Sequence, residues 1–483
     1  MITFIIGLII LIVGGSLYGL FCEKIVKPTD NPTPAVTKRD DVDFVPMSGK
    51  RNALIELLNI AGTGPILGPI QGALFGPIAF ITIPIGCVIA GAFHDYMVGM
   101  ISIRNEGAQV PGLIRKIIGE HFYRIYLVFV CLLLLLIGVV FIYTPGDIFV
   151  NSLLNQKTSL SNPVMWIVYI AIFGYYIIAT LLPIDKIIGK IYPIFGAILI
   201  ISAIAIFIGL FVKGYPLIEL WNSSSYHWNT NFIPIFFVTV TCGICSGFHS
   251  TQATIISRTV SNEHTGRWTF YNMMLVEGFI AMVWAAVSMS TYIQGMTNSH
   301  TISNSPTSIV GMVAKDMLGP IGGTIAIIGV IVLPITSGDT ALRSLRLMIC
   351  DALGISQKAK KRILLVALLI FATVAIILIL AKANPSGFNV LWRYYSWANE
   401  ASIIFVFAMI AIYMKRNNLP YIMALGPGCF YVFIVTSFIL NARIGLSLPW
   451  PFSYIAASAS TIAYAVTICR IKSNQLNSGF AQS

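Results

Sequence analysis

Charged residues are scarce in this sequence. Only 10% of its 483 residues are Asp, Glu, Lys or Arg, whereas 57% are hydrophobic. A soluble globular chain of this size does not need so many apolar residues, so the composition indicates a polytopic α-helical membrane protein. Alternating strands of about ten residues, which mark an outer-membrane barrel, are also missing.

Several chemical signatures are absent as well. The eight cysteines are scattered, mostly within apolar segments, and offer no disulfide framework. Cys242 and Cys245 have the spacing of a redox or zinc pair, but no second pair accompanies them, which favours small-residue packing. There is no H-E-x-x-H, no P-loop and no dinucleotide fingerprint. We therefore exclude ATP-driven transport within this chain and expect no bound cofactor beyond a coupling proton or sodium ion.

Positive charge is in excess, with a formal net charge of +12. The basic residues lie in short loops between apolar runs, which is typical of membrane topology and does not indicate nucleic-acid binding. One set of alternate loops holds all but six of the 30 basic residues, so we place that side in the cytoplasm. The N-terminus is then outside and the C-terminus inside. The six exceptions are Lys157, Lys213, Lys315, Lys382, Arg393 and Arg443.

About thirteen apolar runs are long enough to cross a bilayer. They span roughly 2–21, 53–76, 78–101, 125–149, 164–183, 191–212, 232–256, 269–293, 319–341, 363–382, 389–414, 420–440 and 453–469. We interpret the first as a retained span, because it lacks the basic start and the small-residue cleavage site of a signal peptide.

The runs predict three parts. Residues 1–52 hold one span and an extended cytoplasmic lead-in, residues 53–414 hold a ten-helix core, and residues 415–483 hold two spans and a cytoplasmic tail. The two halves of the core are about 53–212 and 232–414. Residues 307–318 predict a short amphipathic external helix.

One run of the core is interrupted by helix-breaking residues. Residues 59–69 read Asn-Ile-Ala-Gly-Thr-Gly-Pro-Ile-Leu-Gly-Pro, and such glycines and prolines lower helix propensity. Unwound backbone at membrane depth is tolerated only where it is buried in protein or lines a wet cavity. A glycine-rich packing face with a proline kink is the alternative. A substrate site here would use Gly62, Thr63, Gly64 and Pro65.

A second interruption lies in the run 232–256. Its candidate substrate-binding residues are Gly243, Ser246, Gly247, His249 and Gln252. Five spans from residue 53 precede this run and five are completed from it, and the two interrupted runs cross in opposite directions. This arrangement predicts an inverted-repeat transporter whose site lies where the breaks meet. The symmetry is one of topology, because the halves share no residue-level identity.

Five motifs resemble the carbon starvation protein A (CstA) family. They are Ala61–Gly68, Ala90–Tyr96 followed by Arg104–Gly107, Cys242–Gln252, Pro334–Thr340 and Trp392–Asn399. The resemblance runs from about residue 22 to about residue 415. It implies an inner-membrane transporter associated with peptide uptake during carbon starvation, related to the five-plus-five (LeuT/APC-like) inverted-repeat transporters. Some members carry pyruvate with protons, and others are longer than this chain.

Ionisable residues within spans are functional candidates by default, because they are expensive in a bilayer. His94 with Asp95 could relay protons or could form a structural hydrogen-bonded pair. Glu277 suits a proton-coupling acid, since a lone buried carboxyl group favours its neutral form. It could equally pair with an arginine of another span. Asp339 is a further candidate, but it lies four residues from Arg343 and could form an ion pair with it.

Two more groups complete the candidates. By analogy with inverted-repeat transporters, the carbonyls of Ala61 and Gly64 with the hydroxyls of Thr336 and Ser337 would form a sodium-like site. A proton or a structural water is the alternative. In the span 389–414, Trp397 and Asn399 are candidate substrate contacts, and Arg393 and Glu400 share a helix face because they lie two turns apart.

These observations favour a secondary active importer of short peptides, or of pyruvate as the alternative, and no enzyme. A zwitterionic peptide would engage both the half-helix N-termini and the free carbonyls, whereas pyruvate would engage one of them. A membrane enzyme would need an oriented nucleophile–base pair, and the sequence offers no convincing one. A passive channel or sensor is the third class. The expected partners are the small substrate and the lipid bilayer, and the oligomeric state is open.

Overall fold

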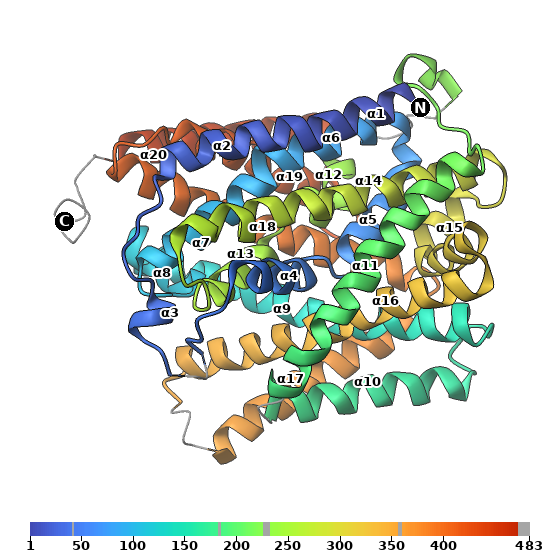
Figure 1. Cartoon of the computed structure of the whole chain (residues 1–483), viewed down its shortest axis with the longest axis horizontal. Helices are drawn as coiled ribbons and strands as arrows, with labels where there is room; N and C mark the ends of the chain where they lie inside the picture. The colour runs from blue at the N-terminus through green and yellow to red at the C-terminus, as the bar shows by residue number, and fades with distance from the viewer. Residues whose placement is uncertain (41–42, 182–184, 226–231, 356–359, 472–483) are drawn as a thin grey trace.

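Helices account for the ordered structure of this chain. The computed structural model describes residues 1–40, 43–181, 185–225, 232–355 and 360–471. Within these ranges the one extended pairing is an isolated parallel bridge between Met47 and Val260. The long helices lie side by side in one bundle (Figure 1). The all-helical class is confirmed, while the expected tail from residue 473 lies outside the described residues.

The helices follow one another along the chain without intervening sheets. Their bounds are α1 Ile2–Ile9, α2 Gly15–Val26, α3 Pro34–Thr37, α4 Gly49–Ile60, α5 Gly64–Gly72, α6 Ala79–Gly86, α7 Phe93–Arg104, α8 Val110–Ile117, α9 Glu120–Ile148, α10 Pro163–Leu181, α11 Asp185–Val212, α12 Phe232–Val240, α13 Gly247–Ile256, α14 Asn272–Ile293, α15 Ser299–Asn304, α16 Pro306–Ala352, α17 Lys360–Ala383, α18 Gly387–Arg416, α19 Ile422–Asn441 and α20 Trp450–Arg470.

Eleven helical stretches within the described ranges are long and apolar enough to cross a membrane, whereas the sequence predicts about thirteen. One of the eleven, Gly64–Arg104, takes in parts of two expected spans, because short helical turns bridge the chain reversal at Gly76. The expected span 164–183 is represented by a shorter apolar helix, Pro163–Ala179. The chain is therefore a multi-span membrane protein, and the number of thirteen spans stays a prediction.

The first interrupted helix breaks between α4 and α5. Ala61 has a non-helical backbone (φ −77°, ψ 51°), and the helix resumes at Gly64. The sequence placed this break at residues 62–65, but it lies at 61–63. Gly64 and Pro65 occupy the first helical positions of α5, where a proline loses no hydrogen bond because the first turn has no partner for its N–H.

The second interrupted helix breaks between α12 and α13. Its backbone passes through a 3₁₀ turn at Thr241–Gly243 and becomes extended at Ser246 (φ −138°, ψ 132°) before α13 begins at Gly247. Both predicted interruptions are therefore present.

The two breaks touch each other. A Cβ atom added to Gly64 would lie 2.1 Å from the Cβ of Cys242, so only glycine permits this approach. Near the other break, Gly243 packs against Pro69 and against Ala281 of α14. Helices α7, α14, α16 and α18 pack against the two interrupted helices, most of whose residues are buried.

Another chain reversal divides the long helix α16. Gly319 has φ 71° and ψ −179°, which is a left-handed conformation that favours glycine. Residues 306–318 thus form a helical segment distinct from the membrane-crossing part, as the sequence predicts.

The lead-in is more ordered than the sequence predicts. It contains the short helix α3, and its residues pack against the segment that follows α13. The Thr33 hydroxyl donates to the carbonyl of Val260 (2.6 Å), and the side-chain amide of Asn52 donates to the carbonyl of Thr259 (3.0 Å). In both cases a side chain donates a hydrogen bond to a backbone carbonyl that would otherwise bond to water.

Candidate functional site

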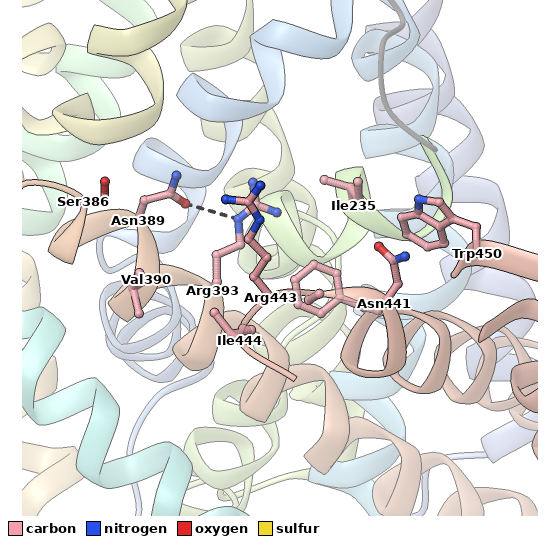
Figure 2. A pocket seen from close by; sticks show the side chains of 11 residues that line it. Ile235, Ser386, Asn389, Val390, Arg393, Asn441, Arg443, Ile444 and Trp450 are labelled. Carbon is pink, nitrogen blue, oxygen red and sulfur yellow. Dashed lines mark hydrogen bonds between the residues drawn. The ribbon is translucent and has the colours of Figure 1, made fainter. Parts of the chain in front are cut away.

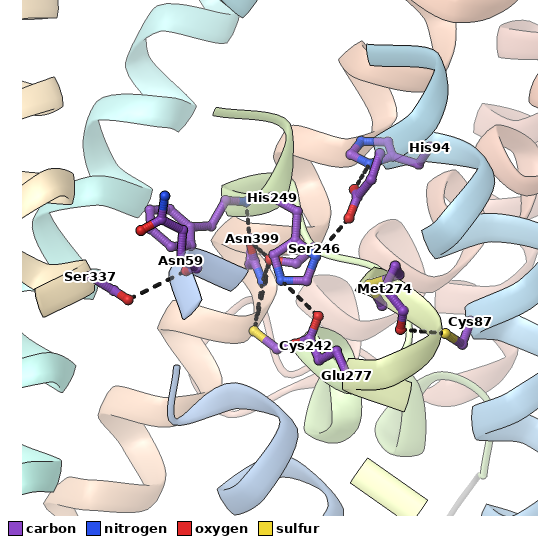
Figure 3. Close-up of polar contacts among 12 residues, drawn as sticks. Asn59, Cys87, His94, Cys242, Ser246, His249, Met274, Glu277, Ser337 and Asn399 are labelled. Atoms are coloured by element: carbon purple, nitrogen blue, oxygen red, sulfur yellow. Dashed lines mark hydrogen bonds and ion pairs between the residues drawn. The ribbon is translucent and has the colours of Figure 1, made fainter. Parts of the chain in front are cut away.

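Four ionisable side chains meet beside the two breaks. His94 and Asp95 come from α7, His249 from α13 and Glu277 from α14 (Figure 3). Asp95 lies 2.8 Å from His94 Nδ1 and 3.3 Å from His249 Nδ1, and His249 Nε2 lies 3.6 Å from Glu277. The structure thus brings together all four of these residues, which the sequence singled out as the pair His94–Asp95 and as the two single residues His249 and Glu277.

The contacts of His249 and His94 with their carboxylate partners differ in hydrogen-bond geometry. The His94–Asp95 pair meets the geometry of a hydrogen bond. The two contacts of His249 are close enough for ion pairs, yet His249 Nδ1 and both oxygens of Glu277 make no aligned hydrogen bond. Small movements of α13 or α14 would therefore change the partners of His249.

Glu56 of α4 is a member of this group that the sequence reasoning missed. Its side chain is fully buried, neither carboxyl oxygen has a hydrogen-bond partner, and it interacts electrostatically with Asp95. Glu277 in turn interacts with both of them. Three carboxyl groups from three different helices, those of Glu56, Asp95 and Glu277, therefore lie in one buried group. The available signal in the sequence is a carboxylate three residues into the expected span 53–76.

Unpaired polar atoms surround the breaks on other elements too. The side chains of Thr63, Thr241, Gln252 and Glu400 each bury an oxygen or nitrogen that has no hydrogen-bond partner. Such groups are normally satisfied in a folded interior, and unpaired ones call for a ligand, ion or water. The centre of the molecule therefore offers a polar surface in a region otherwise filled by apolar side chains.

Asn399 of α18 holds the second break in place. Its side-chain oxygen accepts from the backbone N–H of Phe248 (3.0 Å) and from the hydroxyl of Ser246 (3.1 Å), and its amide donates to Cys242 Sγ (3.3 Å). It therefore supplies a hydrogen-bond partner to a backbone N–H in the first turn of α13, which has no partner within the helix. Tyr395, one turn earlier, contacts Cys242 Sγ at 2.9 Å.

One of the two hydroxyls expected for a sodium-like site lies next to the first break. The Ser337 hydroxyl donates to the carbonyls of Leu58 and Asn59 (3.3 and 3.4 Å), at the end of α4 (Figure 3). The Thr336 hydroxyl donates to Leu333 of its own helix. Ser337 thus faces the first break, but it reaches carbonyls two to three residues before Ala61. Across the described part of the chain, no set of three or more His, Cys, Asp or Glu side chains is arranged to hold a metal ion.

Other candidates lie away from the breaks. Asp339 forms an ion pair with Arg343 (3.3 Å) and accepts from the Tyr175 hydroxyl (3.1 Å), so the ion-pair interpretation describes its geometry. The Trp397 indole donates to the carbonyl of Val435 in α19 (3.2 Å) and packs outward from the break. Arg393 bonds to Asn389 and not to Glu400.

Comparison with known proteins decides the family. The model of the family "Carbon starvation protein CstA" matches residues 1–219 and 146–321. This chain belongs to the CstA family. It is 39% identical over 339 residues to an uncharacterized membrane protein of Haemophilus influenzae, an alignment that covers 60% of this chain and 91% of that protein.

Two relatives from Escherichia coli K12 carry functional names. The chain is 24% identical over 362 residues to the peptide transporter CstA, covering 62% of this chain and 51% of the relative. It is 23% identical over 396 residues to the pyruvate/proton symporter BtsT, covering 66% and 54%. The alignments thus span about half the length of these named members.

Solved structures share the fold at low sequence identity. A Na⁺-coupled sialic acid symporter superimposes with a TM-score of 0.54 at 17% identity, covering 97% of this chain and 98% of that one. The manganese transporter of Eremococcus coleocola superimposes with a TM-score of 0.54 at 10% identity, covering 89% and 96%. This CstA family member therefore shares its overall fold with these two proteins.

Proposed function

We propose that this CstA family member is a secondary active transporter of the bacterial inner membrane that imports short peptides. In this proposal residues 53–414 form a five-plus-five inverted-repeat core, and the crossings 53–76 and 164–183 complete a set of thirteen spans. The N-terminus is outside and the C-terminus is cytoplasmic. The chain belongs to a family named for carbon starvation, which supports a role under carbon starvation for this protein too.

The observation that carries the proposal is the contact of two unwound helices inside a buried polar centre. Half-helix N-termini attract a carboxylate, and the free carbonyl ends attract a cation or an amine. Thr63, Ser246 and Gln252 place side-chain polar groups beside these termini, and the backbone at Gly62, Gly64, Pro65, Gly243 and Gly247 can approach a substrate closely. A zwitterionic peptide matches both kinds of terminus.

Coupling to protons is favoured by the group formed by His94, Asp95, His249 and Glu277. A proton gained by His249 would strengthen its attraction to Asp95 and Glu277 and would shift α13 relative to α7 and α14. Ser337 beside the carbonyls of Leu58 and Asn59 leaves sodium as the second candidate ion.

Proton-coupled import of pyruvate or another small carboxylate is the alternative substrate class. It is supported by the similarity to a pyruvate/proton symporter and by the cluster of the ionisable side chains His94, Asp95, His249 and Glu277 beside the breaks. Transporter relatives and a transporter fold argue against a membrane enzyme.

Uptake by proteoliposomes that contain the purified full chain tests this proposal. Labelled di- and tripeptides and labelled pyruvate are supplied in parallel, with an inward proton gradient, an inward sodium gradient or neither. We expect saturable peptide uptake that the proton gradient accelerates. Uptake of pyruvate alone would refute the peptide substrate, and uptake that never saturates would indicate a channel.

The Glu277→Gln variant addresses the coupling residue in the same assay. Glutamine keeps the size of the side chain but cannot release a proton, so we expect substrate-driven proton flux to fall by about tenfold or more while substrate binding persists. A thermal unfolding profile like that of the parent shows that the variant is folded. Unchanged coupling would redirect the search to Asp95 and Glu56.

A further inference from the structure

A cavity with two arginines in its walls lies outside the polar centre. It has a volume of about 340 Å³, within the ~300–1,000 Å³ range of small-molecule sites. Its walls come from α12, the first turns of α18, the end of α19, the following turn and the start of α20 (Figure 2). The lining residues include Arg393, Arg443, Asn389 and Asn441, and none of them is acidic.

Arg393 is the charged group set deepest in this cavity wall. Its Nε–H donates to the side-chain oxygen of Asn389 (3.2 Å), and its guanidinium lies 6.0 Å from the ring centre of Phe438. Among the residues that the structure describes, no carboxylate lies within ion-pair distance of Arg393 or of Arg443. Arg393 is half-buried, so an anionic partner would offset the cost of burying its guanidinium group, and the exposed Arg443 brings a second positive charge to the same cavity.

The distribution of charge along the chain supports the same conclusion. Arg393 and Arg443 are two of the six basic residues that fall outside the cytoplasmic set of loops. The positive-inside bias therefore does not account for them. Both instead face one cavity, although 50 residues separate them in the chain.

The remaining walls define the rest of the ligand. Ile235, Val390, Phe438, Ile444 and Trp450 provide an apolar surface next to the two guanidinium groups. Guanidinium forks bind carboxylate and phosphate oxygens in bidentate pairs. A ligand that fills this cavity would therefore combine one such anionic group with an apolar portion.

We propose that this cavity is an anion-binding site for a small amphiphile with a carboxylate or phosphate group, held by Arg393 and Arg443. The anion comes either from a water-soluble organic acid or from the headgroup of an anionic lipid. The site adjoins the second interrupted helix, since Ile235 belongs to α12 and the indole of Trp392 donates to the Thr239 carbonyl (3.2 Å). Occupancy would thus stabilise α12 against α18. Its existence does not depend on which substrate the chain transports.

Ligand-dependent thermal unfolding of the purified full chain in neutral detergent tests the proposal. The probes are dihexanoyl phosphatidylglycerol, dihexanoyl phosphatidylcholine of equal chain length, sodium butyrate and sodium pyruvate. We expect at least one anionic probe to raise the unfolding midpoint in a saturable manner, because a ligand that binds the folded state stabilises it. Phosphatidylcholine should not do so.

The pattern of probes separates the two sources of the anion. A shift with phosphatidylglycerol alone assigns the site to a lipid headgroup, and a shift with butyrate or pyruvate assigns it to a soluble acid. In either case Arg393→Gln and Arg443→Gln should each weaken the apparent affinity by about tenfold or more, as expected for the loss of a charge-assisted hydrogen bond. Arg470→Gln, at the opposite end of α20, should leave it unchanged.

Two outcomes would overturn the proposal. One is the absence of any midpoint shift with all anionic probes up to saturating concentration, and the other is an equal shift in the parent and in Arg443→Gln. Arg443 lies in an exposed turn, so we expect Arg443→Gln to fold like the parent. This variant therefore tests the site even if Arg393→Gln disturbs the packing around α18.

Discussion

Single residues in this protein depend on partners from distant parts of the chain. Asp147 of α9 and Lys382 of α17 form a buried ion pair at 2.7 Å, and Lys382 also lies 4.1 Å from the ring centre of Tyr143. The hydroxyl of Tyr169 donates to the same carboxylate. Neither charged residue was paired with the other by sequence reasoning, because 235 positions separate them.

Replacing Lys382 tests the importance of this pair. Lys382→Met leaves Asp147 buried without its cation, and such a loss typically costs about 3–5 kcal/mol. We expect a clearly lower unfolding midpoint in detergent, with recovery of most of the loss in Lys382→Met/Asp147→Asn. Arg124→Met removes an exposed pair with Glu120 and serves as the control, with an effect of about 0–1 kcal/mol. Equal effects of the two single variants would contradict the argument.

At the scale of elements, the interrupted helices are defined by what packs against them. Gly64 is the first residue of α5 and lies in direct contact with Cys242. The side-chain oxygen of Asn399 in α18 accepts a hydrogen bond from the backbone N–H of Phe248 at the start of α13. The described residues of the lead-in segment, 27–40 and 43–48, lie against the chain that leaves α13. Arg104 joins these parts, since it bonds to Glu263 (2.9 Å) and to the carbonyls of Val26 and Lys27.

A methyl group at Gly64 should separate the two breaks. The added Cβ would lie 2.1 Å from the Cβ of Cys242, so α5 or α12 must move. We expect Gly64→Ala to lower the stability by about 1–3 kcal/mol, as overpacking does, and to reduce uptake in proteoliposomes. Gly174→Ala is the matched control, because nothing lies within 4 Å of its added Cβ. Full uptake by Gly64→Ala would show that this close approach is not needed for transport.

Loss of Glu263 should release the lead-in segment. Glu263 accepts from Arg104 and from the backbone N–H of Thr29 (2.9 Å), and both Arg104 and Glu263 are largely buried. Limited trypsin digestion should therefore cut at Lys27, Lys38 or Arg39 about tenfold faster or more in Glu263→Gln than in the parent. Glu106→Gln, which removes only the exposed pair with Lys38, is the control and should change the rate little.

At the scale of the whole molecule, the charge distribution predicts that the two ends of the chain lie on opposite sides of the membrane. Charge distribution predicts that the end of α20 is cytoplasmic and that the connection between α9 and α10 is external. Cys469 is exposed in the last turn of α20, so its modification can report the side on which it lies.

Labelling with a membrane-impermeant maleimide tests this orientation. We expect Cys469 to react in inside-out vesicles and to remain unlabelled in intact cells, while Ser159→Cys should react in intact cells. The Cys469→Ser variant shows which part of the signal belongs to that residue. Labelling of Cys469 from outside would invert the proposed topology.

The sequence by itself determined the membrane class, the approximate spans and the two interrupted helices. These follow from local properties, since apolar length, glycine, proline and loop charge act within a few residues of their own position. It also named His94, Asp95, His249 and Glu277, because an ionisable residue in an apolar run stands out without any partner. The family motifs coincide with these same segments.

Only the tertiary structure decided which of these residues lie together. It placed His249 between Asp95 and Glu277, added Glu56, turned Trp397 away from the breaks and paired Asp147 with Lys382. It also set Arg393 and Arg443 on one cavity. The physical reason is that helix packing and chain reversals fix which faces meet, and contacts between positions hundreds of residues apart leave no local signal in a single sequence.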